Sequence, residues 1–287
     1  MSKLLKNFWF SYKNILLREI EKKNYFAFLR KIFGTLYKFL IKIIKSNFSS
    51  KIIDLDKSNN QNLFNQPLDK IFIYFNCDKG SLCILNNKKI KSHNYSPFYE
   101  KYLENRRSSK INILELGSHE GKGIASYYYY FHNSNLTGVN INPFQMKVSS
   151  RRITELFTDV SSEKNLKNLA NHLAQEQDII IDDASHNLRD ILISFAILFR
   201  KLKKGGIYIM EDMDQFKSLK ELNPYTNELT PKEILRNIQN HILFQSSFIK
   251  QEEKNYLIKN IKDIKIEKGS MTINDYNASD IAFIFKK

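Results

Sequence analysis

Short apolar runs alternate with amphipathic stretches through the middle of this chain, and the alternation predicts strands separated by helices. The runs with the length of buried strands are 111–114, 136–141, 153–157, 178–182 and 207–210. The helical stretches between them lie around 127–131, 163–175 and 187–203. This succession indicates an α/β fold with a doubly wound, mainly parallel sheet.

The strict alternation stops after Asp212, and other signals predict the elements that follow. The sequence Thr230-Pro231-Lys232-Glu233 has the form of a capping box with proline at the first helical position, which predicts the start of a helix. Residues 261–266 and 281–285 are apolar runs separated by a polar turn. We expect them to form the last two strands.

The first 46 residues form a basic, amphipathic extension that we expect to be helical. They hold eleven Lys and Arg residues against two glutamates, and so carry nine of the fifteen net positive charges. Charges interrupt every apolar run well before the roughly 20 residues that a bilayer span needs. No small-residue cleavage site follows an apolar core, so a signal peptide is not expected. The extension could lie on an anionic membrane surface, or pack on the rest of the chain or on a second subunit of a homo-oligomer.

The rest of the chain reads as a polar linker, 47–70, followed by one domain, 71–287. Within that domain we expect a lead-in at 71–110, a core at 111–215, and an acceptor or lid region with the last strands at 216–287. The domain carries only six net positive charges and no RNA-reading motif, so no nucleic-acid partner is expected. Two cysteines, Cys77 and Cys83, form no disulfide framework and fit a reducing, cytoplasmic environment.

Paired carboxylates follow two of the predicted strands. Asp182 and Asp183 end one strand, Glu211 and Asp212 end the next, and His186 lies three residues after the first pair. Neighbouring parallel strands lie about 4.8 Å apart, so these carboxylates can converge where open α/β sheets bind ligands. Oxygen donors suit Mg²⁺, and a nearby histidine could act as a general base. Alternatively, the acidic residues only cap the helices that follow.

A glycine-rich turn follows the first strand of the core. Glu115, Gly117 and Gly121 lie there, at the expected start of a helix. Glycine lets the backbone approach a ligand, although a tight turn alone also favours it. The spacing is not Gly-x-Gly-x-x-Gly and no Gly-Lys-Ser/Thr loop is present, which argues against nicotinamide and nucleoside triphosphate binding.

Several motifs together resemble one known family. In chain order they are Asp78-Lys-Gly-Ser, His93-x-Tyr95, Tyr99-Glu100, Ile113-Leu-Glu-Leu-Gly117, Asp182-Asp-Ala-Ser-His186 and Gly205-Gly-x-Tyr-x-x-Glu211-Asp212. This pattern resembles the class I S-adenosylmethionine-dependent methyltransferases, which have a Rossmann-like sheet. Within that class it is similar to the metal-dependent sugar O-methyltransferases of macrolide and polysaccharide pathways, and to cephalosporin-hydroxylase-type proteins. The resemblance spans roughly residues 76–215.

The resemblance implies a role for each matching residue. The implied Mg²⁺ ligands are Asp183, Glu211 and Asp212, and the implied general base is His186. The implied S-adenosylmethionine contacts are Glu115, Gly117, Gly121, Asn140, Asp159 and Asp182. Asp78, Lys79, His93 and Tyr95 belong to a lead-in that closes over cofactor or acceptor. Asn140 departs from the family, which usually has an aspartate for the ribose hydroxyls, and a neutral hydrogen bond is the weaker one.

The expected function is Mg²⁺-dependent methylation of a sugar or glycoside hydroxyl, with S-adenosylmethionine as donor, in surface polysaccharide or glycolipid biosynthesis. Two alternatives stay open: methylation of a non-sugar diol, and a non-catalytic scaffold of the same fold at a membrane-bound glycan assembly. The expected location is cytoplasmic, peripheral to the membrane if the extension binds lipid.

Overall fold

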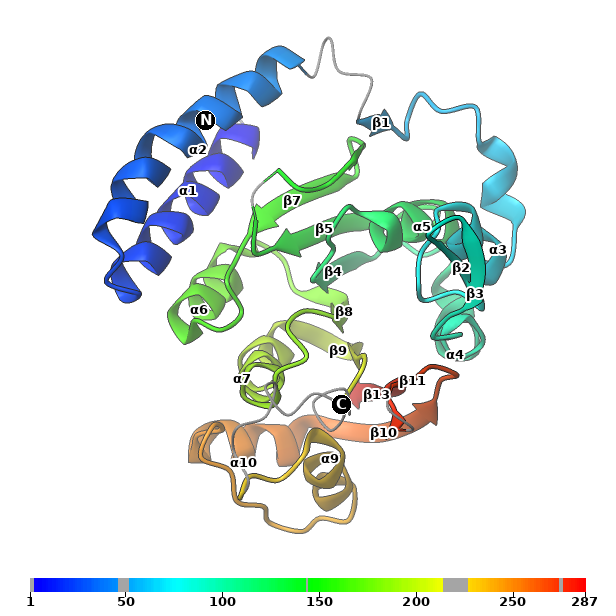
Figure 1. The fold of residues 1–287 in the computed structure, drawn as a ribbon. Helices are drawn as coiled ribbons and strands as arrows, with labels where there is room; N and C mark the ends of the chain where they lie inside the picture. Colours follow the sequence, from blue (N-terminus) through cyan, green and yellow to red (C-terminus); the bar gives the residue numbers. More distant parts are fainter. Residues whose placement is uncertain (1–2, 46–51, 143, 214–226, 274–275) are drawn as a thin grey trace.

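A seven-stranded sheet forms the centre of the computed structural model, which describes residues 3–45, 52–142, 144–213, 227–273 and 276–287 (Figure 1). Its strands are β4 (Asn112–Leu116), β5 (Asn135–Asn140), β7 (Ile153–Phe157), β8 (Gln177–Asp182), β9 (Leu202–Met210), β10 (Ile261–Lys268) and β13 (Asp280–Lys286). Residues 47–51 of the expected linker and 216–226 of the expected acceptor region lie outside the described residues.

The strands lie in the order β10-β13-β9-β8-β4-β5-β7. Strands β7, β5, β4, β8 and β9 are parallel, whereas β13 is antiparallel to both β9 and β10. The chain leaves β4 toward one edge through β5 and β7, and then returns to the other side of β4 as β8. A ligand crevice is expected outside the carboxyl end of β4, where the direction of winding changes. The predicted doubly wound, mainly parallel sheet is confirmed.

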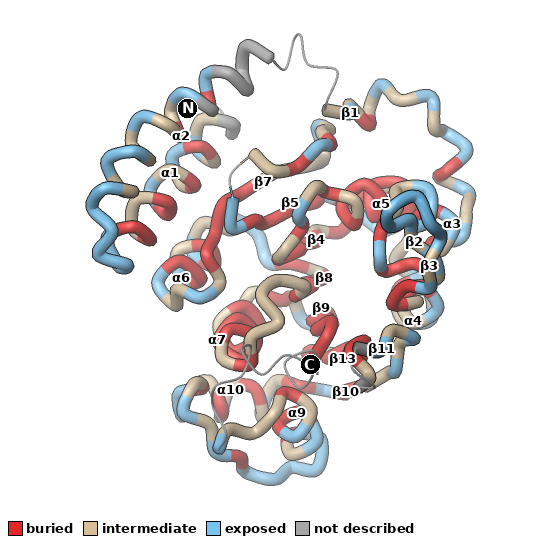
Figure 2. The backbone as a smooth tube through the Cα atoms, viewed as in Figure 1, coloured by how far each residue is buried: buried red, intermediate tan, exposed pale blue. Residues whose placement is uncertain are grey.

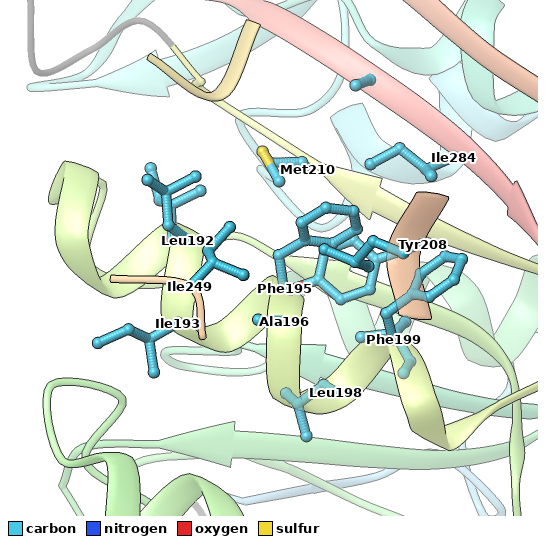
Figure 3. Close-up of a cluster of buried hydrophobic side chains, with 14 of the residues drawn as sticks. Leu192, Ile193, Phe195, Ala196, Leu198, Phe199, Tyr208, Met210, Ile249 and Ile284 are labelled. Atoms are coloured by element: carbon cyan, nitrogen blue, oxygen red, sulfur yellow. The ribbon is translucent and has the colours of Figure 1, made fainter. Parts of the chain in front are cut away.

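Helices cover both faces of this sheet because its central strands are apolar on both sides. Along β8, Ile180 packs into one core and Ile179 and Ile181 into the other, as the two-residue period of a strand requires. The helices on the two faces are α5 (Lys122–Tyr130), α6 (Glu163–His172), α7 (Leu188–Leu198), α3 (Leu68–Tyr74), α4 (Ser96–Leu103) and α10 (Gln251–Asn260). Figure 3 shows Phe195 and Phe199 from the α7 side against Tyr208 of β9.

The C-terminal third follows the sequence signals closely. Helix α9 (Pro231–Gln239) starts at the predicted capping box, in which Thr230 and Glu233 bond each other's backbone N–H groups. The helix expected at 187–203 ends earlier, because α7 tightens into a 3-10 turn, η3 (Phe199–Lys201), and β9 begins directly afterwards. The remaining short strands here are β11 (Thr272–Ile273) and β12 (Tyr276–Asn277).

Residues 52–70 are ordered and packed, unlike the polar linker that the sequence predicts. Leu55, Leu63 and Leu68 are buried in the core beneath α5. The elements here and in the lead-in are β1 (Ile53–Asp54), which pairs with β6 (Val148–Ser149), η1 (Gln61–Asn65), the hairpin β2 (Leu82–Leu85) and β3 (Lys88–Lys91), and η2 (Glu104–Arg106). The isolated leucines in a polar stretch gave no periodic signal.

Two helices, α1 (Lys3–Glu21) and α2 (Tyr25–Lys45), form a hairpin beside the edge strand β7 (Figure 1). The Ser11 hydroxyl accepts a bond from the N–H of Phe157 at 3.1 Å, and the Asn14 amide donates to the Phe157 carbonyl at 3.4 Å. These bonds pair backbone N–H and C=O groups of β7 that would otherwise have no hydrogen-bond partner at the edge of the sheet. Among the described helices, none combines the length and apolar character needed to cross a bilayer.

Candidate active site

The glycine-rich turn after β4 has the backbone conformation that requires glycine. Gly117 has φ +80° and Gly121 φ +86°, in the left-handed region. A Cβ atom added to Gly117 would overlap the carbonyl oxygen of Asp183, which follows the neighbouring strand β8. The glycine therefore allows the turn after β4 to lie against the end of β8.

Three side chains with metal-binding atoms meet beside this turn. The closest ligand atoms of Asp183, His186 and Asp212 lie within 4.8 Å of one another. His186 Nε2 is 3.8 Å from Asp183 Oδ1 and 4.0 Å from Asp212 Oδ2. His186 and Asp212 both have positive φ, 53° and 52°, a strained conformation for residues with a Cβ. Such strain concentrates at functional sites.

Lys79 connects the acidic residues of the two strand ends. Its ammonium group contacts carboxylate oxygens of Asp183 and Glu211, and lies 3.9 Å from Glu115 Oε1. Burial alone would lower the pKa of Lys79, but the two contacting carboxylates raise it well above its usual range. Lys79 is therefore a buried, charged group that holds these acidic side chains together.

Aromatic side chains of the lead-in fix the second acidic pair. The Tyr95 hydroxyl donates to Asp212 Oδ1 at 2.5 Å, and the Tyr99 hydroxyl donates to Glu211 Oε1 at 2.5 Å. His93 Nδ1 lies 3.2 Å from Asp212 Oδ1. Glu211 thus has Tyr99 on one oxygen and Lys79 on the other, and it is not among the three residues whose ligand atoms cluster.

Two adjoining cavities flank the glycine turn and share Gly117, His119 and Ala184 in their walls. The larger, about 500 Å³, is lined by Asp78, Lys79, His93, Glu115, Asp183 and His186 among others. The smaller, about 380 Å³, is lined by Asn140, Thr158 and Ser185 among others. Together they divide the crevice into an acidic compartment and a compartment beside the end of β5.

Glu115 provides an unsatisfied acceptor in the acidic compartment. It is 1% exposed, and its Oε2 atom is buried without a hydrogen-bond partner. Burial raises its pKa to about 7, although Lys79 acts in the opposite direction. A buried carboxylate oxygen of this kind fits a ligand that brings a positively charged nitrogen, because such a group would stabilise the ionised form.

The other expected cofactor residues lie around the smaller cavity or below it. Asn140 donates to the carbonyl of His119 at 3.0 Å, so part of its amide already supports the glycine turn. Asp159 is buried, accepts from the Ser161 hydroxyl at 2.6 Å, and has Oδ2 3.6 Å from Lys22. Asp182 is buried and accepts from the Tyr208 hydroxyl at 2.8 Å, and burial raises its pKa to about 7.

The donor set fits a divalent cation. Three carboxylates, those of Glu115, Asp183 and Glu211, lie around the ammonium group of Lys79, and Asp212 adds a fourth beside Asp183 and His186. The carboxylates outnumber that cation, so the cluster favours a further positive charge. Carboxylate oxygens are the donors that Mg²⁺ takes, and the imidazole of His186 widens the choice to other divalent ions.

The chain is similar in sequence to curated O-methyltransferases, whereas no family model matches it. It is 28% identical over 128 residues to demethylmacrocin O-methyltransferase of Streptomyces fradiae, a match that covers 42% of this chain and 32% of that protein. It is 27% identical over 158 residues to L-olivosyl-oleandolide 3-O-methyltransferase of Streptomyces antibioticus, covering 51% and 37%. The matches thus span about a third of the length of these curated relatives.

Solved structures decide the fold. A MycE methyltransferase complex with Mg, SAH and mycinamycin VI superposes with a TM-score of 0.59 at 19% identity, over 77% of this chain and 54% of that one. A second MycE complex, with Mg and SAH, gives 0.58 at 20% identity. The chain has the class I methyltransferase fold. The expected resemblance and the expected fold class are therefore confirmed.

Within this methyltransferase fold, the structure adds site residues that the sequence did not single out. Ser279 lies 3.0 Å from His93 Nδ1 through its hydroxyl, and it comes from the turn before β13. The sequence motif Tyr99-Glu100 predicts no contact for Tyr99, whose hydroxyl donates to Glu211. Lys22, at the tip of the N-terminal hairpin, reaches Asp159 from outside the methyltransferase fold. No local sequence signal relates these pairs, because each joins distant segments.

Replacing Gly117 by alanine is expected to destabilise the methyltransferase fold at the site itself. The left-handed conformation costs an L-residue about 1–2 kcal/mol, and the added methyl group would overlap the Asp183 carbonyl. We expect a lower urea midpoint. The matched control is Gly205→Ala, also at positive φ (+71°) but with no neighbouring atom within 4 Å of its added Cβ. Equal losses in both variants would mean that the contact with Asp183 contributes nothing.

Proposed function

We propose that this chain is an S-adenosylmethionine-dependent O-methyltransferase that acts on a sugar or glycoside hydroxyl and uses Mg²⁺. The observation that carries the proposal is the cluster of Asp183, His186 and Asp212 in the crevice of a methyltransferase fold. One curated relative supports the substrate class, because its name, L-olivosyl-oleandolide 3-O-methyltransferase, describes methylation of a glycoside.

In this proposal the sulfonium cofactor occupies the crevice at the carboxyl end of β4. Glu115, whose Oε2 atom is buried without a partner, would bind the amino group of its methionine part. Gly117 and Gly121 would let the backbone approach it, and Asn140 would face the ribose, with Asp159 and Asp182 supporting that side. The smaller cavity beside Asn140 gives room for the adenosine part.

Asp183 and Asp212 would hold the divalent cation, and Glu211 would be the third carboxylate. Glu211 and Asp183 both contact the ammonium group of Lys79. When bound, the cation supplies positive charge that favours ionisation of a nearby hydroxyl. Asp78, His93 and Tyr95 would position the acceptor or close the site, since Asp78 and His93 line the acidic cavity and Tyr95 fixes Asp212.

His186 would then take the proton of the acceptor hydroxyl on a ring nitrogen. The acceptor oxygen forms a bond to the methyl carbon, and the bond from that carbon to the sulfonium sulfur breaks with its electrons returning to sulfur. Alignment of the three reacting atoms supplies much of the rate, because well-oriented groups can contribute about 7–11 kcal/mol. In this proposal the side chains of the acidic compartment would provide that alignment.

We further propose that the acceptor belongs to surface polysaccharide or glycolipid biosynthesis in the cytoplasm. The support is chemical: an oxygen-donor cation site suits adjacent hydroxyl groups, which sugars provide. A non-sugar diol would satisfy the same donors. Activity toward a set of free sugars, nucleotide sugars, lipid-linked glycans and catechols would distinguish these acceptors.

Titration calorimetry tests the cofactor assignment directly. S-adenosylmethionine is titrated into the full-length chain with Mg²⁺ or with EDTA, and we expect a micromolar Kd. Glu115→Gln should weaken binding about tenfold, because a charge-assisted hydrogen bond is replaced by a neutral one. Glu267→Gln, at the far side of the sheet, is the control and should bind as the unmodified chain does. Absence of binding in both conditions would favour the scaffold function.

A further inference from the structure

The outward face of α2 carries a continuous row of large apolar side chains. Their exposed fractions are 80% for Phe26, 59% for Leu29, 73% for Phe33, 66% for Tyr37 and 56% for Leu40. At 100° per residue these five positions fall within an arc of about 80°. From Phe26 to Leu40 the row extends about 21 Å along the helix. We call these five residues the outer stripe; Figure 2 shows the exposed outer side of α2.

The outer stripe is not used to attach the hairpin to the methyltransferase domain. α2 packs on α1 through its other face, where Thr35 and Phe39 are buried and the Phe39 ring stacks on Phe8 at 3.7 Å. α1 in turn lies against β7 and α6 (Figure 1). The stripe therefore lies mostly in solvent, and large exposed apolar patches often mark interaction sites.

The charges around the outer stripe are positive. Arg30 lies between Phe26 and Phe33 on the same side of the helix and is exposed, as are Lys22 and Lys23 in the turn before α2. The sequence of α2 contains no acidic residue. Of the two glutamates in α1, Glu19 is buried against Arg18 and Glu21 accepts a bond from Ser162. An apolar row beside exposed cations fits the interface of an anionic bilayer.

We propose that the outer stripe of α2 binds the surface of a membrane that contains anionic lipids. The helix lies parallel to the bilayer, with the aromatic rings at the boundary between headgroups and acyl chains and Arg30 and Lys23 on the headgroup phosphates. A second copy of this chain is the less favourable occupant, because two such faces would bring their positive charges together. The inference concerns the hairpin alone and does not depend on the proposed methyl transfer.

A hairpin bound to the membrane would hold the carboxyl ends of β5 and β7 near the membrane surface. Lys22 reaches Asp159, and an Arg18 N–H group donates to the Ile141 carbonyl at 3.3 Å, next to the cavity beside Asn140. The hairpin that meets the membrane is thus tied to the strand ends where the site lies. This arrangement suits an acceptor presented at a membrane surface.

Vesicle co-sedimentation tests the proposal with the full-length chain. The probes are vesicles of phosphatidylcholine alone and of phosphatidylcholine with phosphatidylglycerol. We expect binding to the anionic vesicles that weakens with added salt. The double variant Phe26→Ser/Phe33→Ser should bind at least about tenfold more weakly, because two large apolar side chains no longer enter the bilayer. The matched control, Leu85→Ser/Leu243→Ser, removes two exposed apolar side chains elsewhere and should bind normally.

Three results would overturn the proposal: no sedimentation with anionic vesicles, equal binding to both vesicle types, or equal losses in the stripe variant and its control. A light-scattering measurement of molecular mass tests the alternative that a second copy of this chain binds the outer stripe. A dimer that the stripe substitutions dissociate, together with absent vesicle binding, would assign the face to a second copy. Circular dichroism should report unchanged helix content in both variants, because all four replaced side chains are exposed.

Discussion

Replacing His186 by alanine is expected to lower the rate of methyl transfer by about 10²–10⁴-fold, the usual contribution of a general base. The imidazole lies 3.8 Å and 4.0 Å from the carboxylates of Asp183 and Asp212 and lines the acidic compartment. Burial alone would lower the pKa of His93, but the contact of its Nδ1 with Asp212 raises it, so this ring favours its protonated form and is the weaker candidate for a base. The measurement is single-turnover transfer from S-adenosylmethionine to the identified acceptor.

Two further readouts separate a base from a metal ligand at this position. If His186 is only the base, its removal leaves the Kd for S-adenosylmethionine and the Mg²⁺ concentration for half-maximal activity unchanged. If it is a ligand, the required Mg²⁺ concentration rises. His241→Ala serves as control, because that side chain is exposed and lies in the turn after α9. Full activity in His186→Ala would show that His186 is not the proton acceptor.

The elements that the sequence predicted well are those whose signal is local. The runs that became β4, β8 and β9 are apolar at successive positions because both faces of a central parallel strand are buried. The start of α9 was readable because a capping box is complete within four residues. The acidic pairs could be placed near each other because adjacent parallel strands end at the same edge.

Contacts between distant segments could not be read in the same way. Lys79 stands 104 residues before Asp183 and 132 before Glu211, so only the fold reveals that one ammonium group joins both. The same holds for Ser11, which caps β7 from α1, 146 residues away. Residues 52–70 read as a linker because their few leucines follow no period, although the fold buries them.

Replacing Lys79 by methionine is expected to lower the free energy of unfolding by about 3–5 kcal/mol, the usual cost of removing one partner from a buried ion pair. Methionine keeps much of the side-chain volume, so the loss would be mainly electrostatic. Asp183 and Glu211 would lose the cation that contacts both, and Glu211 is only 2% exposed. Urea unfolding in EDTA measures the change without a competing divalent ion.

A second substitution distinguishes lost charge pairing from lost packing. In Lys79→Met/Glu211→Gln one of the two uncompensated carboxylates is neutral as well, so part of the stability should return and the two changes should not be additive. Lys101→Met is the control, because that lysine pairs with Glu267 at the surface and should contribute little. If the double variant is as unstable as the sum of both single changes, Lys79 acts through packing rather than through its charge. Partial recovery would show that the charge of Lys79 stabilises the carboxylates that follow β8 and β9 when no divalent ion is bound.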